Sequence, residues 1–159
     1  MKYDFLTKML IVSLLRVRLL TKTQARIILA RNPNAFKKTI NALLNDGIII
    51  EKRHSVFKIL RLTDKGKSLA LALTKTVIPD EYLKDKNLPT EPLYTVQEVS
   101  EMLNRSPNTI RKILRENKLG YKIAKGRLIR GNYNKSKMYF IPESDLERIK
   151  SFIKRSKGE

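Results

Sequence analysis

Nearly the same phrase occurs twice in this chain, at an offset of 74 residues. It reads ARNPNAFKK near the start and NRSPNTIRK in the second half. At this offset the prolines Pro33 and Pro107 coincide, and so do two capping boxes, Thr21 with Gln24 and Thr95 with Glu98. A capping box begins one helix, and a proline at the first helical position begins the next. Each half is therefore predicted to contain the helix-turn-helix arrangement.

The charge limits the class of partner. The 159 residues include 34 Lys and Arg against 15 Asp and Glu, a net charge of +19. Residues 1–78 hold 16 cations and 4 anions, residues 79–93 hold 2 and 4, and residues 94–159 hold 16 and 7. Polyanions such as nucleic acids are the expected partners of so basic a chain. We predict two domains, 1–78 and 94–159, joined by a proline-containing linker at 79–93.

We expect a mainly α-helical fold with small β-hairpin wings, an α+β class with two winged helix-turn-helix domains. In the first half, strands Ile48–Glu51 and Val56–Leu62 are predicted to form a hairpin with KRHS as its turn. In the second half, a long basic hairpin is expected between two short strands. Helices Phe5–Leu20 and Thr63–Ile78 are apolar on more than one side. They are predicted to form the interface of a homodimer, or alternatively to cover each other or the second domain.

The second helix of each half has an outward face rich in Asn, Lys and Arg. Such side chains suit the major groove, because Lys and Arg donate to guanine and Asn pairs with adenine. The predicted DNA-contacting residues of the helices are Asn34, Lys37, Lys38, Asn41 and Asn45, then Ser106, Asn108, Arg111, Lys112 and Arg115. Those of the wings are Lys52, Arg53 and Lys58, then Lys125, Arg127, Arg130, Lys135 and Lys137, with Tyr133 either contacting DNA or packing on its own hairpin.

Two stretches resemble known families. LLNDGIIIEKR, followed by FKILRLTDKGKSL, resembles winged-helix transcription regulators of archaea and bacteria, with LTDKGK as its most telling piece. YTVQEVSEMLNRSPNTIRKILRENKLGYKI, followed by YFIPESDLERI, resembles MerR-like and excisionase-type DNA-binding domains. The second resemblance implies that residues 106–116 enter the major groove. The segment RLIRGNYNKSKM is longer and more basic than that family usually has. No effector-binding domain follows, so no small-molecule ligand is inferred.

The leading hypothesis is a sequence-specific double-stranded DNA-binding protein that regulates transcription. Two alternatives stay open: a plasmid or viral replication-initiation, partition or excisionase-type protein, and a non-specific architectural or RNA-binding protein. We do not expect an enzyme, a metal site or a cofactor, because the chain has no Cys, one His and no glycine-rich phosphate loop. The apolar run Met9–Leu15 is too short to span a bilayer, and we expect a cytoplasmic, nucleoid-associated protein.

Overall fold

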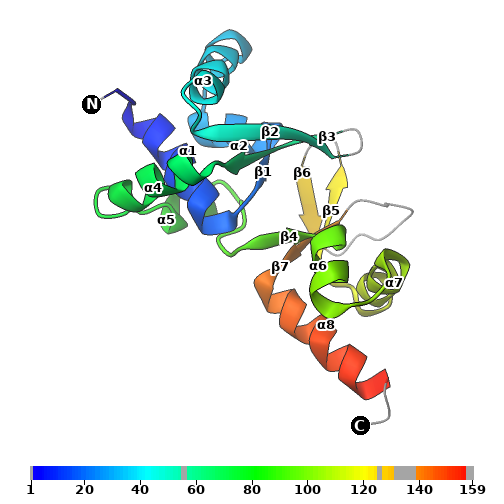
Figure 1. The fold of residues 1–159 in the computed structure, drawn as a ribbon. Helices are drawn as coiled ribbons and strands as arrows, with labels where there is room; N and C mark the ends of the chain where they lie inside the picture. Colours follow the sequence, from blue (N-terminus) through cyan, green and yellow to red (C-terminus); the bar gives the residue numbers. More distant parts are fainter. Residues whose placement is uncertain (1, 55–56, 125–126, 131–138, 157–159) are drawn as a thin grey trace. The chain divides into compact units, whose positions relative to one another are not determined.

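The computed structural model describes residues 2–54, 57–124, 127–130 and 139–156 (Figure 1). The chain divides into two compact units, Met1–Thr90 and Glu91–Glu159. Each unit has its own apolar core and its own small antiparallel sheet. The predicted fold class, mainly α with small β-hairpin wings, is therefore confirmed.

The first unit is a winged helix with additional helices before and after it. Its sheet is antiparallel in the order β1-β3-β2, so the β2–β3 hairpin forms the wing that follows α3. Its elements are α1 (Phe5–Val17), β1 (Leu20–Thr21), α2 (Lys22–Leu29), α3 (Pro33–Asn45), β2 (Ile49–His54), β3 (Phe57–Leu62), α4 (Asp64–Leu73) and α5 (Asp80–Asp85).

The second unit repeats the strand–helix–helix–hairpin order and closes with one helix. Its sheet has the order β4-β7-β5-β6. The offset of 74 residues relates α2 to α6 and the start of α3 to the start of α7. The elements are β4 (Leu93–Thr95), α6 (Val96–Leu103), α7 (Pro107–Asn117), β5 (Tyr121–Ala124), β6 (Arg127–Arg130), β7 (Tyr139–Pro142) and α8 (Glu143–Ser156).

Both predicted capping boxes are present. The hydroxyl of Thr21 accepts from the backbone N–H of Gln24, whose side chain accepts from the Thr21 N–H in return. Thr95 and Glu98 make the same two bonds. Each box follows a short strand, β1 or β4, that pairs with the last strand of its sheet. The boxes therefore fix where each short strand ends and the helix after it begins.

Helix α1 is the centre of the first core. Leu10, Ile11 and Val17 are completely buried, and α1 packs mainly on α4 and α2. It ends at Val17, earlier than the predicted Leu20, because Arg18 adopts a left-handed φ of 73° and Leu20 begins β1. Most of the apolar surface that suggested a dimer interface is therefore buried inside this unit.

The first wing is longer than predicted. Lys52 pairs with Ile59 and Arg53 with Lys58, and the β2–β3 ladder extends to His54. The prediction that KRHS forms the turn was therefore wrong, because Lys52, Arg53 and His54 belong to β2. Polar residues fit this strand because the end of a two-stranded ribbon does not have to cover a core.

The segment predicted as a linker, 79–93, mostly belongs to the two units. Leu83 of α5 is completely buried in the first core, and Leu88 packs against that core. The hydroxyl of Tyr82 donates to the carbonyl of Ile28 at 2.7 Å. At the other end Leu93 is completely buried in the second unit. Its prolines and charges resemble a linker's composition, but its three leucines are used as core residues.

Candidate nucleic-acid interface

Helix α3 presents one polar face and buries the other. The side chain of Asn32 accepts from the N–H of Ala35 at 2.9 Å, and Pro33 follows it as the first helical residue. Phe36, Ile40 and Leu43 are buried. The opposite side, here called the α3 face, is exposed and consists of Asn34, Lys37, Lys38, Asn41 and Asn45. Within the described part of the chain, none of these five side chains bonds to another residue, so all their donors point to solvent.

Helix α3 is held at its middle and at its end by residues outside it. At its middle, the hydroxyl of Thr39 accepts from the Arg31 guanidinium at 2.5 Å, and Arg31 also pairs with Asp4. At its end, the hydroxyl of Tyr3 donates to the Asp46 carboxylate at 2.6 Å. Hydrogen bonding by the side chain of Thr7, followed by the bond from the Thr7 N–H, is the main cause that lowers the pKa of Asp4, and the Tyr3 bond is the main cause that lowers the pKa of Asp46. Burial, followed by the bond to Asp46, raises the pKa of Tyr3 to about 12, so Tyr3 stays a donor at neutral pH.

The LTDKGK motif locks α4 against the turn that follows α3. The Thr63 N–H donates to the carbonyl of Ile48 at 3.0 Å, and its hydroxyl accepts from the N–H of Gly66 at 2.9 Å. Lys65 donates to the carbonyl of Asp46 at 2.8 Å. A Cβ on Gly66 would lie 2.0 Å from the Ile48 oxygen, so only glycine allows this approach. The motif thereby fixes the end of α3 and the start of the wing.

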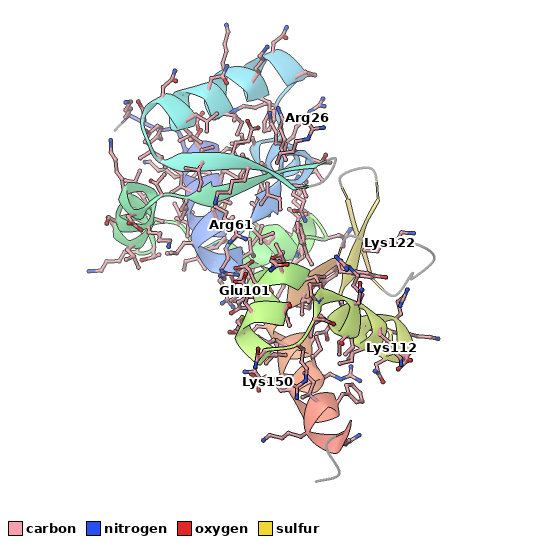
Figure 2. The ribbon with its side chains drawn as sticks, turned by 45° about the vertical axis from the view of Figure 1, so that its right-hand side comes forward. Arg26, Arg61, Glu101, Lys112, Lys122 and Lys150 are labelled. Carbon is pink, nitrogen blue, oxygen red and sulfur yellow. The ribbon has the colours of Figure 1, made fainter. Side chains whose placement is uncertain are left out.

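Helix α7 is built in the same way as α3. Ser106 caps it by accepting from the N–H of Thr109 at 3.1 Å. Ile110 and Leu114 are completely buried. The opposite side, here called the α7 face, is exposed and consists of Asn108, Lys112 and Arg115. Figure 2 shows Lys112 projecting away from the helix.

The side chains of the α7 face have neighbours that those of the α3 face lack. Arg111 was predicted to face outward, but it is half-buried, because its position lies at the edge of the helix. Its guanidinium donates to the side-chain oxygen of Asn108 at 3.0 Å. Lys112 lies 3.9 Å from the Glu116 carboxylate. Burial raises the pKa of Tyr139, and the nearby charges of Arg115 and Arg111 act in the opposite direction.

The structure describes more of the first wing than of the second. Lys52, Arg53 and Lys58 are exposed on the β2–β3 hairpin. In the second wing, Arg127 and Arg130 belong to β6 and pair in register with Ala124 and Tyr121. The other predicted contacts of this wing lie outside the described residues: Lys125, Tyr133, Lys135 and Lys137.

Sequence reasoning missed the residues that hold the α3 face in place. Tyr3, Arg31 and Lys65 were not singled out for any role, because a contact between distant segments leaves no local pattern. The repeat did align Arg31 with Arg105, but Arg105 donates to the carbonyl of Asn104 and so has a different role. Within the described ranges, no group of three or more His, Asp or Glu residues is placed to hold a metal ion. No helix there is long and apolar enough to cross a membrane.

Comparison with known proteins agrees with this geometry for the second unit. Residues 93–151 match the family described as "Helix-turn-helix domain", a match that spans β4 to α8. The second unit is therefore similar to helix-turn-helix domains over this range, which includes α6 and α7. A search of curated proteins found no match.

Two solved structures show a distant likeness to about 70% of the chain. One is a mutant MarR from E. coli complexed with operator DNA, which is 15% identical, with 71% of this chain and 76% of that chain covered and a TM-score of 0.42. The other is a MarR family transcriptional regulator from Silicibacter pomeroyi DSS-3, 13% identical, with 70% and 72% covered and a TM-score of 0.37. Superposition at this level is too loose to assign a fold or function.

Proposed function

We propose that the protein binds double-stranded DNA in a sequence-specific manner and regulates transcription. The observation that carries the proposal is the pair of helices α3 and α7. Each begins with a polar cap and a proline, buries one side, and presents Asn, Lys or Arg on the other. No carboxylate occurs in the first two turns of either helix. An α-helix fits the major groove, where these side chains read base edges and contact phosphates.

In this proposal the chain carries two winged helix-turn-helix domains, the second of the MerR-like or excisionase type. The α3 face reads one segment of the groove and the α7 face another. Lys52, Arg53 and Lys58 of the first wing bind the backbone or the minor groove beside it. A net charge of +19 favours rapid association with DNA.

The test is selection of preferred duplexes from a random pool, followed by competition with unrelated duplex. A specific regulator prefers its site by about 10³-fold or more. Enrichment of one motif, with this preference in competition, is the expected result. A pool that stays random after selection would contradict the proposal and favour a non-specific architectural or RNA-binding role. Mapping the motif in the source genome then distinguishes promoters from replication origins or attachment sites.

We further propose that the chain forms a homodimer through the first unit. Although α1 is largely buried, three apolar side chains on or near α1 and α4 stay exposed: Phe5 at 59%, Leu71 at 62% and Ile78 at 75%. Exposed apolar surface of this kind marks interfaces when it is contiguous. Size-exclusion chromatography with light scattering tests the proposal, and a monomer of 18.5 kDa at tens of micromolar would contradict it.

A further inference from the structure

A groove lies beside the α7 face, between α7 and α8. It has a volume of about 510 Å³ and is lined by Thr109, Lys112, Ile113, Glu116 and Asn117 of α7 and by Phe152 and Arg155 of α8. Half-buried Ile113 and Phe152 pack against the core of the unit and supply the apolar wall. Lys112 and Arg155 are exposed at its rim. The groove therefore joins the α7 face to a cation that comes from a different helix.

The position of Arg155 is fixed by its own helix. Its guanidinium lies 5.8 Å from the centre of the Phe152 ring, within the range of a cation–π interaction. A guanidinium held in this way loses less side-chain entropy when it binds an anion than a free lysine would. The ring that holds it is itself fixed by the core, so Arg155 is placed for binding along the edge of α7.

The two long edges of α8 differ in what they border. Arg148 and Arg155 are seven residues apart and so lie on one edge, next to Phe152. Lys150 and Lys154 are four residues apart on the other edge, where they line a separate pocket with Leu103 and Arg105. Figure 2 shows Lys112 and Lys150 projecting to opposite sides of the unit. Helix α8 thus carries cationic side chains on both edges, but only those on the Phe152 edge border the α7 face.

We infer that this groove binds the sugar–phosphate backbone of the DNA strand that flanks the major groove occupied by α7. The inference rests on the proposed function and adds a contact surface to it. A helix in the major groove has a phosphate backbone on each side, and phosphate contacts fix its position. Lys112 and Arg155 line the groove and so serve the side of α7 that faces α8. Arg155 is a positioning residue that binds phosphate and reads no base.

Glu116 is the one carboxylate that lines the groove, and its effect on an approaching phosphate is unfavourable. Glu116 also lies 3.9 Å from Lys112 and so offsets part of the positive charge of that lysine. Replacing Glu116 with glutamine removes the repulsion and keeps the shape. The site therefore makes two predictions of opposite sign, one for Arg155 and one for Glu116.

The experiment measures duplex affinity by fluorescence anisotropy across a salt series for Arg155→Ala, Glu116→Gln and the matched control Lys154→Ala. Arg155→Ala is expected to weaken binding to every duplex about tenfold, and to reduce the magnitude of the salt slope by about 0.9. Glu116→Gln should strengthen binding to every duplex. Lys154→Ala has the same charge change on the other edge of α8, so its effect should be much smaller. Thermal unfolding followed by circular dichroism should be unchanged for all three, because these side chains are exposed.

Equal effects of Arg155→Ala and Lys154→Ala would overturn the inference and leave the proposed function intact. Weaker binding by Glu116→Gln would also overturn it. A wild-type protein that binds no duplex would overturn both the groove and the proposed function. If the Arg155→Ala variant preferred a different sequence, instead of binding all sequences less tightly, Arg155 would be a base-reading residue and the inference would be wrong.

Discussion

The α3 face and the α7 face share one design and differ in what holds them. The five side chains of the α3 face bond to no other residue in the described part of the chain, but α3 is anchored from outside, at its middle by Arg31 and at its end by Tyr3 and Lys65. In α7 the side chains themselves are engaged, as Arg111 donates to Asn108 and Lys112 lies near Glu116. The first unit fixes helix α3 and leaves the side chains of the α3 face unbonded, whereas in the second unit side chains of the α7 face are themselves held by neighbours.

This difference has an energetic consequence for binding. Free Asn and Lys side chains lose rotamer entropy when they bind, at a cost of about 0.5–1.5 kcal/mol for each long side chain. Asn108 is already oriented, so it loses less. Its oxygen, however, is partly occupied by Arg111, which leaves its amide N–H groups as the freer donors. We expect the α3 face to adapt to several sequences and the α7 face to be more selective.

The largest expected effect is a loss of stability when one glycine in each unit is replaced by alanine. Gly66→Ala would place a Cβ 2.0 Å from the Ile48 carbonyl oxygen, which outweighs the better helix propensity of alanine. We expect a loss of about 2–4 kcal/mol in the first unit. Gly120 has a φ of +80° and more room, with Leu114 Cδ2 3.2 Å away, so Gly120→Ala should cost about 1–2 kcal/mol in the second unit. Hydrogen exchange read by mass spectrometry localises each loss.

That experiment has a built-in control, because each variant serves as the reference for the other unit. If Gly66→Ala loosened α6–α8 as much as α2–α4, the two units would unfold together, and comparing them as separate structures would be mistaken.

The next effect concerns the outward lysines. Lys38→Ala and Lys112→Ala should each weaken specific binding by about 1–2 kcal/mol, with melting unchanged because both side chains are exposed. The effect of Lys38→Ala should be the larger, since Lys112 shares its charge with Glu116. Titration of the selected duplex measures both. A change in melting without a change in affinity would show that the lysine does not face the DNA.

A smaller effect is expected at Lys37 and Arg111, which are equivalent positions of the repeat. It distinguishes an effect on the preferred base from a uniform effect on DNA affinity. Arg111→Met should release Asn108 and change the base preferred at one position of the DNA segment that the α7 face reads. The expected loss of binding free energy is about 1 kcal/mol. Lys37, which occupies the same place in the repeat, bonds to no neighbour within the described ranges. Lys37→Met should instead weaken all duplexes uniformly. Repeating the duplex selection on both variants measures this, and identical motifs for wild type and Arg111→Met would contradict it.

The smallest effect is expected in acid and concerns two carboxylates of the first unit. The pKa values of Asp4 and Asp46 are lowered by folding, so the stability they contribute is complete above about pH 4 and is lost as the pH falls through the folded-state values. The first unit should therefore loosen slightly below about pH 4. Asp46→Asn should reduce this pH dependence in a pH series of thermal melts. An unchanged series would mean that the Tyr3 bond does not stabilise the end of α3.

The sequence predicted local structure well and long-range contacts poorly. Caps, helix starts and the repeat follow from neighbouring residues, so Thr21, Pro33, Thr95 and Pro107 were placed correctly. The half-burial of Arg111 and the anchoring of α3 depend on segments that meet only in the folded chain. Leu83 illustrates the limit: proline and charge around it resemble a linker, and only packing shows that it is a core residue.

The packing of that segment also determines how much free chain joins the two units. The side chain of Glu91 accepts from the N–H of Ser144, and the carbonyl of Pro92 accepts from the N–H of Glu143, so both belong to the second unit. With Leu88 packed on the first core, only Pro89 and Thr90 serve as a tether. In the proposed function both units bind one duplex, and a tether this short would then give the second unit a high effective concentration at one spacing of the two DNA segments and a steeply lower one at others. Inserting base pairs between the segment read by the α3 face and the segment read by the α7 face should therefore weaken binding by the chain even when both segments keep their sequence.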